Sequence, residues 1–211
     1  MNWFPSNGSN KLIVAIDSSS NDYEEHQELS SRGYDILVVD HHEADKYSEN
    51  AVVINNQLSE KYGNKMASGV GVIYKFFECW ESMYGGQSAQ NYLDLVALGE
   101  ISDVMQMTTP ENRYICDYGL SHLNNKFFKE LVAKQAFSLG DKPLSQIGVA
   151  FYITPLINAL IRVGNPLEKE RLFLAFTSPD TSVPSTKRGE KGLMETICTQ
   201  SIRNCVNAKA R

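Results

Sequence analysis

Residues 35–44 read DILVVDHHEA and hold most of the information about the fold. The stretch opens as a short apolar run rich in branched side chains and then turns polar at an Asp-His-His triplet. Similar apolar runs occur at Lys11–Ile16 and Ala51–Ile54, and a helical stretch from about residue 22 to residue 32 separates the first run from the second. Continuous apolar runs joined by a helix are typical of parallel strands buried on both faces. We therefore predict an α/β fold with a parallel sheet near the N-terminus and flanking helices.

The sequence beyond residue 67 is mostly helical in character. A stretch rich in Pro, Ser and Thr, residues 178–189, is typical of a linker, and residues 190–211 are expected to form a single amphipathic connector helix. In the part of the chain before that linker, Gly and Pro residues mark where helices are expected to begin and end. We expect helices there over residues 66–84, 88–102, 126–137, 153–163 and 166–176, with one more that starts at Pro110.

The composition is that of a folded, soluble protein. Hydrophobic residues make up 42% of the 211 residues and charged residues 21%, which excludes a disordered or collagen-like chain. The net charge of −5 excludes a protein that holds nucleic acid by bulk charge, so any such partner must be bound locally. No stretch supplies the roughly 18 uninterrupted apolar residues of a membrane span. The four cysteines form no CxxC pair. We expect a cytoplasmic protein with reduced cysteines and no membrane partner.

Polar side chains follow two neighbouring strands of the predicted sheet. Asp40, His41 and His42 come directly after the second apolar run, and Asp17 follows the first. The carboxyl ends of consecutive parallel strands meet at one edge of a sheet, where ligands bind in open α/β folds. Carboxylate oxygens mixed with imidazole suit Mn²⁺ or Mg²⁺. The alternative is structural: an Asp that caps the next helix and histidines that are ordinary surface or core residues.

A third acidic candidate stands at the end of an apolar segment. Asp103 follows the run LDLVALGEIS, residues 93–102. Taken alone, Asp103 would be interpreted as a capping or surface residue. It becomes a candidate site residue only in combination with the polar residues at the strand ends.

Several segments resemble, in order, the motifs of a known family. VVDHHEA (residues 38–44) resembles the motif that names the DHH phosphoesterase superfamily, and LIVAIDSSS resembles the strand-plus-Asp motif before it. SGVGVIYKF and DLVALGEISDVM resemble the two motifs that follow. PENRYICDYGL and AFYITPLINALIR are similar, more narrowly, to segments of RecJ-like exonucleases specific for single-stranded DNA. The resemblance covers about residues 11–211.

The resemblance implies roles for particular residues. Asp17 would bridge two divalent ions, Mn²⁺ or Mg²⁺, and His41 and Asp103 would bind one of them. Asp40 would orient the cluster or bind at its edge, and His42 would contact the scissile phosphate or protonate the leaving group. Arg162, Asn158 and Arg113 would be the phosphate contacts. For Arg113 the structural alternative is an ordinary surface ion pair.

The chain also departs from the family pattern. Family members carry an earlier Asp-x-Asp motif that supplies ligands to the second metal, and residues 1–10 contain no Asp, Glu or His. Ile161 stands where exonuclease relatives have a glycine. A smaller C-terminal domain follows the connector helix in the family. We therefore expect residues 1–177 to be a DHH-type catalytic core, incomplete at its N-terminus, in a partial or split gene product of phage or prophage origin.

The leading functional hypothesis is a metal-dependent exonuclease that degrades single-stranded DNA from the 5′ end in DNA repair and recombination. One alternative is a truncated, catalytically impaired remnant or nucleic-acid-binding module. A second is a DHH phosphodiesterase acting on short oligonucleotides or cyclic dinucleotides. Single-strand-binding or replication proteins are candidate partners, and no feature of the sequence indicates an oligomeric state.

Overall fold

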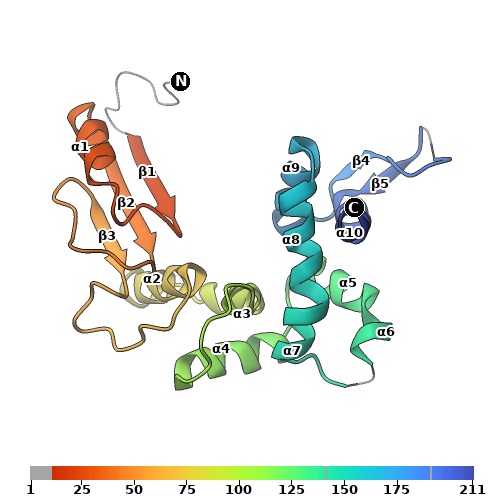
Figure 1. Ribbon diagram of the computed structural model, residues 1–211, viewed down its shortest axis with the longest axis horizontal. Coiled ribbons are helices and arrows are strands. Elements are labelled where there is room, and N and C mark those ends of the chain that lie inside the picture. Colours follow the sequence, from red (N-terminus) through yellow and green to blue (C-terminus); the bar gives the residue numbers. More distant parts are fainter. Residues whose placement is uncertain (1–10, 141, 191) are drawn as a thin grey trace. The chain divides into compact units, whose positions relative to one another are not determined.

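The computed structural model describes residues 11–140, 142–190 and 192–211 (Figure 1). The chain divides into two compact units, which are treated separately below. The first comprises Met1–Gln90 and Asp103–Arg113, and the second comprises Asn91–Ser102 and Tyr114–Arg211.

The first unit is built on a parallel sheet of three strands in the order β1-β2-β3. These strands are β1 (Lys11–Ile16), β2 (Tyr34–Asp40) and β3 (Val52–Asn55), and α1 (Tyr23–Ser31) connects the first two. In the register, Ile16 pairs with Val39 and Asp40 pairs with Asn55, so the carboxyl ends of all three strands meet at one edge. The predicted α/β class and parallel sheet are confirmed.

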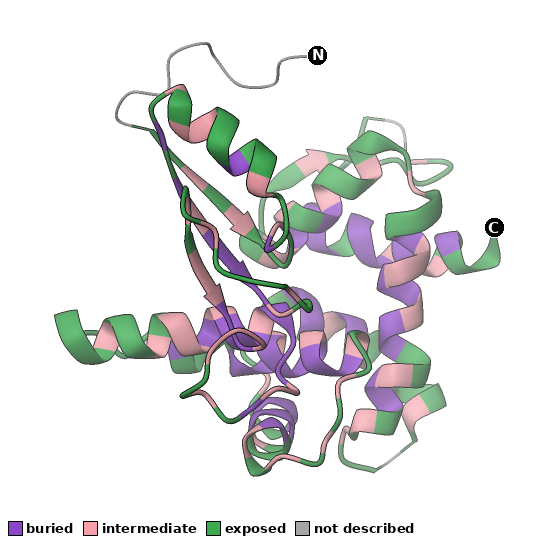
Figure 2. Cartoon of the chain, turned by 60° about the vertical axis from the view of Figure 1, so that its left-hand side comes forward, coloured by how far each residue is buried: buried purple, intermediate pink, exposed green. Residues whose placement is uncertain are grey.

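The prediction that these strands are buried on both faces is correct for β2 and wrong for β1. Val38 and Val39 in β2 are 0% and 3% exposed, whereas Leu12, Val14 and Ile16 in β1 are 61%, 48% and 54% exposed. Figure 2 shows this contrast between the two strands. Within the described residues β1 has only one neighbouring strand. Leu12, Val14 and Ile16 alternate along β1 and therefore share one face of the strand, which is open to solvent.

Helix α2 (Gly69–Tyr84) closes the hydrophobic core of the first unit. Ser68 caps its start, with its side chain accepting a hydrogen bond from the Gly71 backbone N–H. Val72 of α2 packs in one buried cluster with Val39 and Ala67. The partly buried side chains around that cluster are Leu37, Ile54 and Ile73.

The second unit is helical. Its core contains Phe127, Phe128, Leu131, Leu160 and Ile197, each exposed by no more than 2%. A π-helical turn, η2 (Val149–Ile153), leads directly into α8. The helices of this unit are η1 (Ala89–Tyr92), α3 (Leu93–Ser102), α5 (Lys126–Lys134), α6 (Ala136–Leu139), α7 (Gln146–Gly148), α8 (Thr154–Val163), α9 (Pro166–Thr177) and α10 (Ile197–Ala210), while α4 (Pro110–Ser121) starts in the first unit.

The C-terminal region differs from its prediction. Instead of a linker at 178–189 and one helix from 190, the chain forms an antiparallel pair of strands, β4 (Ser182–Pro184) and β5 (Met194–Thr196). Helix α10 begins only at Ile197, where the Thr196 side chain accepts a hydrogen bond from the Thr199 N–H. The turn between the strands contains Gly189, whose φ of 87° suits glycine.

Two further predicted helices are interrupted. The predicted 88–102 helix is a 3₁₀ turn, η1, followed by α3, and the predicted 126–137 helix is divided between α5 and α6.

The continuous helical stretch Gln146–Val163 is long and apolar enough to cross a membrane by length and composition. Core helices of soluble proteins meet the same criterion, and here Val149, Ile153 and Leu160 are fully buried in the second unit. The described cysteines are all free, and only Cys79 is exposed.

Candidate metal centre

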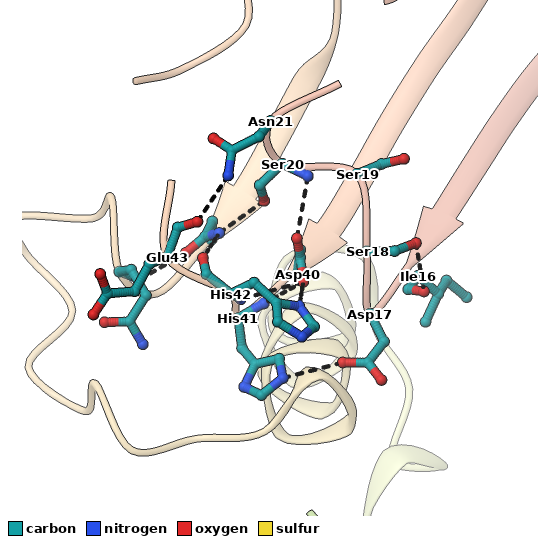
Figure 3. Close-up of polar contacts among 12 residues, drawn as sticks. Ile16, Asp17, Ser18, Ser19, Ser20, Asn21, Asp40, His41, His42 and Glu43 are labelled. Carbon is teal, nitrogen blue, oxygen red and sulfur yellow. Dashed lines mark hydrogen bonds and ion pairs between the residues drawn. The ribbon is translucent and has the colours of Figure 1, made fainter. Parts of the chain in front are cut away.

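The candidate centre stands where β1 and β2 end (Figure 3). Asp17 is the first residue after β1, and its backbone N–H donates a hydrogen bond of 2.9 Å to the carbonyl of Val39. Its φ is 59°, in the left-handed region that few non-glycine residues occupy. Asp40 is the last residue of β2, and His41 and His42 follow it. The sheet therefore brings two carboxylates and two imidazoles to one edge, as the sequence predicted.

His41 lies at the middle of the cluster. Its Nε2 is 3.3 Å from Oδ1 of Asp17 and 3.3 Å from Oδ2 of Asp103. The His41 side chain is 11% exposed, while both carboxylates are about half exposed. Ligand atoms of Asp17, His41 and His42 also lie within 4.8 Å of one another. An imidazole nitrogen between two carboxylate oxygens is a ready-made set of donors for a cation.

The Asp40 carboxylate is buried, and both of its oxygens accept hydrogen bonds within the chain. Oδ1 accepts from the backbone N–H groups of His41 and His42 at 2.8 and 3.3 Å, and Oδ2 accepts from the Ser20 N–H at 3.1 Å. Burial alone would raise the pKa of Asp40, but hydrogen bonds from His42, Ser20 and His41 outweigh it and lower the pKa to about 2. This arrangement favours an orienting role for Asp40 over direct metal binding.

His42 presents an imidazole that Asp40 orients. Its Nδ1 is 2.7 Å from Oδ1 of Asp40, and this hydrogen bond raises the pKa of His42 above its ordinary value. The His42 side chain is 60% exposed. With Nδ1 paired to the carboxylate, Nε2 is the ring nitrogen that can exchange a proton with a bound molecule.

The donor atoms around Asp17 suit a divalent ion. Partial burial raises the pKa of Asp17; His41 opposes this effect and the neighbouring Asp103 carboxylate adds to it. Gly69 faces the carboxylate so closely that a Cβ at position 69 would lie 2.6 Å from Cγ of Asp17. Carboxylate oxygens with one or two imidazoles form a donor set suited to Mn²⁺ or Mg²⁺. The residues present therefore fit such an ion.

Three supporting residues were missed by reasoning from the sequence. Ser20 and Asn55 are buried behind the cluster, where the Asn55 side-chain amide donates to Ser20 Oγ at 2.8 Å and to the His42 carbonyl at 2.9 Å. Asn55 ends β3 just as Asp40 ends β2, so a search for polar residues at the ends of the predicted strands could have found it. The third, Gly69, lies within the SGVGV motif, but its close approach to Asp17 has no signal in the local pattern.

The three predicted phosphate contacts lie on two helices. Arg113 is exposed on α4, and its guanidinium group makes no ion pair with any residue that the structure describes. Asn158 and Arg162 belong to α8 in the second unit. They are four residues apart and therefore on one side of that helix.

A cluster of aspartates and histidines at the carboxyl edge of a parallel sheet defines an α/β protein with a candidate divalent-metal site. Residues 2–100 match the DHH family, N-terminal domain. Through these residues the chain is similar to the DHH family, and the resemblance carried by the sequence motifs is confirmed.

Named relatives are similar over most of this chain. It is 39% identical over 202 residues to the Bacillus subtilis protein named as an SPbeta prophage-derived single-strand DNA-specific exonuclease, YorK. That match covers 95% of this chain and 35% of YorK. It is 28% identical over 164 residues to the single-stranded-DNA-specific exonuclease RecJ of Thermus thermophilus, covering 77% of this chain and 24% of RecJ. The chain thus spans about a third or less of the length of these relatives.

Solved structures share the fold. A crystal structure of exonuclease RecJ bound to manganese superposes with a TM-score of 0.73 at 23% identity, covering 95% of this chain and 47% of that one. A Thermus thermophilus RecJ structure in complex with Mn²⁺ gives a TM-score of 0.68, also at 23% identity, covering 95% of this chain and 28% of that one.

Proposed function

We propose that this chain carries the metal-binding core of an exonuclease that hydrolyses phosphodiester bonds of single-stranded DNA from the 5′ end. The observation that carries the proposal is the position of His41 Nε2, 3.3 Å from a carboxylate oxygen of Asp17 and 3.3 Å from one of Asp103. The names of YorK and RecJ, both single-strand DNA-specific exonucleases, support the substrate. A place in DNA repair or recombination and a cytoplasmic location accord with that activity.

Asp17, His41 and Asp103 would hold Mn²⁺ or Mg²⁺ in this proposal. When bound, the ion polarises a phosphoryl oxygen and lowers the pKa of a coordinated water. The chain's own contribution is to fix the ligands. The left-handed turn at Asp17 and the absence of a side chain at Gly69 together leave the Asp17 carboxylate in its place beside His41.

His42 would act on the phosphate or on the leaving group. Cleavage of the scissile P–O bond releases an alkoxide leaving group, which must take up a proton. A histidine with a raised pKa can donate that proton. Asp40 would hold the His42 ring by its Nδ1 and keep Nε2 directed away from the sheet. Asp40 is thus assigned as a positioning residue.

Single-stranded DNA would be bound through side chains that make no ion pair with the residues that the structure describes. Arg113 on α4 and Arg162 on α8 make no ion pair with described residues, so their guanidinium groups are available to phosphates. Asn158, four residues before Arg162, would add a neutral hydrogen-bond donor.

One observation favours a second candidate, a DNA-binding module with impaired catalysis. The described cluster contains only two half-exposed carboxylates, Asp17 and Asp103, since both oxygens of Asp40 are occupied by hydrogen bonds. That donor set is enough for one ion and falls short of the ligands of two.

The test is hydrolysis of a 5′-labelled DNA 30-mer, single-stranded or as a duplex, and of a dinucleotide, each with Mn²⁺. We expect release of short 5′ products from the single strand only, and loss of release in His41→Ala. Calorimetric titration with Mn²⁺ in the same samples reports metal binding separately. Turnover of the dinucleotide but not of the 30-mer would refute the proposed exonuclease activity. Metal binding and DNA binding without cleavage would establish the second candidate.

A further inference from the structure

A row of large apolar side chains is exposed along the C-terminal half of α2. Phe77, Trp80, Met83 and Tyr84 are 51%, 49%, 64% and 69% exposed, and they are called the aromatic stripe below. Figure 2 shows that burial decreases along α2 toward this end. None of the four residues belongs to the candidate metal centre.

The aromatic stripe is one continuous face of the helix. Its residues recur at spacings of three, four and seven, which places them in line on a helix of 3.6 residues per turn. The Trp80 and Tyr84 rings lie 4.6 Å apart, and Phe76 links them to Phe77, with ring centroids 6.1 Å from Trp80 and 5.3 Å from Phe77. The rings of the stripe are therefore linked through contacts with one another, and Met83 adds a flexible apolar side chain.

The charges beside the aromatic stripe are already paired, including Lys75, which pairs with Glu78 and Glu111. Glu78 accepts hydrogen bonds from Tyr74 and Lys75, and Glu81 accepts from the backbone N–H groups of Ser88 and Ala89. The last turn of α2 contains no basic residue. Without a cation to meet a phosphate, the stripe is a poor surface for DNA or for an anionic membrane. An uncharged, apolar surface is its proper complement.

We propose that the aromatic stripe binds the same stripe of a second copy of this chain. In an isologous contact across a two-fold axis, antiparallel α2 helices would pair with Trp80 near the centre. The partner then supplies an apolar surface of matching length and no unpaired charge. Trp, Tyr, Phe and Met are also the residues most enriched at the cores of protein interfaces.

The area available indicates a weak, reversible dimer. Fully buried aromatic side chains remove roughly 150–250 Å² each from water, so the half-exposed stripe offers on the order of 400–500 Å² per copy. Two copies would bury about 800–1,000 Å², which is below the roughly 1,200–2,000 Å² of stable interfaces and within the range of weak, transient ones. We therefore expect association in the micromolar range, visible only as a concentration-dependent equilibrium.

Sedimentation and light scattering between about 1 and 200 µM test the proposal. The average mass should rise with concentration from the 23.6 kDa of one chain toward twice that value. Trp80→Glu should raise the dissociation constant by at least about 30-fold. The matched control is Phe137→Ser, which removes a fully exposed aromatic ring of α6 and should leave the equilibrium unchanged.

A second readout follows Trp80 directly. The sequence contains only Trp3 and Trp80, so a Trp3→Phe variant emits from Trp80 alone, and its emission should shift to the red on dilution. A constant monomer mass at all concentrations would overturn the proposal, as would a Trp80→Glu variant that still dimerises. Quenching of Trp80 by a DNA 30-mer in a monomeric sample would assign the stripe to nucleic acid instead.

Discussion

Gly69 and Asp17 are in such close contact that the carboxylate of the aspartate occupies the space a side chain at position 69 would need. A Cβ there would lie 2.6 Å from Cγ of Asp17 and 2.9 Å from its Cβ. Since Asp17 comes from the end of β1 and Gly69 from the start of α2, this contact joins the sheet to the helix at the candidate metal centre. It also explains why a helix opens with glycine, a poor helix former.

Gly69→Ala should therefore weaken metal binding. The added methyl group must displace the Asp17 carboxylate, and we expect the Mn²⁺ dissociation constant measured by calorimetry to rise at least about tenfold, or 1.4 kcal/mol. Gly63→Ala is the control, because nothing lies within 4 Å of a Cβ at that position. Equal Mn²⁺ affinity in the two variants would show that Asp17 is not a ligand.

Asp40→Asn should impair catalysis far more than metal binding. The amide cannot offer both oxygens to the N–H groups of Ser20, His41 and His42, so the His42 ring loses its fixed orientation. We expect the rate of DNA hydrolysis to fall about 100-fold, a typical loss for a misplaced proton donor. Mn²⁺ affinity measured on the same sample should change by less than about tenfold. A larger fall in Mn²⁺ affinity than in rate would make Asp40 a ligand.

Val104, directly after Asp103, is a β-branched residue at a φ of 56° and is 85% exposed. That backbone conformation costs an L residue roughly 1–2 kcal/mol, and least when the residue is Asn or Gly. Val104→Asn should raise the free energy of unfolding of the first unit by about 1 kcal/mol, measured by urea titration with Trp fluorescence. Alanine lacks the short polar side chain with which Asn stabilises this conformation, so Val104→Ala should give a smaller gain. A gain of equal size in both variants would mean that the valine side chain, and not the backbone, is the source of strain.

The stability of the second unit should depend on pH through Glu195. Both of its oxygens pair with Arg203, at 2.6 and 2.7 Å, and these hydrogen bonds lower the pKa of Glu195 to about 2. Because the folded pKa is lower than the unfolded one, the stabilisation is complete above about pH 4.5 and is lost as the pH falls toward 2. We expect Glu195→Gln to lower the unfolding free energy by about 2 kcal/mol at pH 7, and by much less at pH 2.5, in urea titrations followed by circular dichroism.

Glu190→Gln is the control for that measurement. Glu190 pairs with Lys187 on the surface, where water screens the interaction, so its removal should change the pH profile much less than removal of Glu195 does. If the unfolding free energy of Glu195→Gln fell with pH in parallel with that of the native chain, the loss of stability in acid would not come from the Glu195 carboxylate.

The first unit could be predicted well because its signals are local and its geometry follows from them. Lys11–Ile16 is a strand with the predicted bounds, and Asp17, Asp40, His41 and His42 meet because parallel strands end at one edge. Asp103 arrives there from the end of α3, which no spacing rule predicts; only the family resemblance suggested it.

The C-terminal region was less predictable because its structure depends on contacts distant in sequence. β4 and β5 pair Ser182 with Thr196 across an irregular turn, and short polar strands carry no periodic signal. The helical pattern of residues 190–196 was outweighed by this pairing and by the cap at Thr196. The role of Gly69 was equally invisible, since a glycine that makes room for another residue looks like any other glycine.

The π-helical turn Val149–Ile153 has a consequence for the residues beyond it. A π turn accommodates one residue more than an α turn, and each residue of an α-helix advances by about 100° around the axis. Everything after the turn is therefore rotated by that amount relative to an uninterrupted helix. Asn158 and Arg162 owe the direction in which they leave α8 to this insertion, so deleting one residue from the turn would redirect both while leaving their identities and spacing intact.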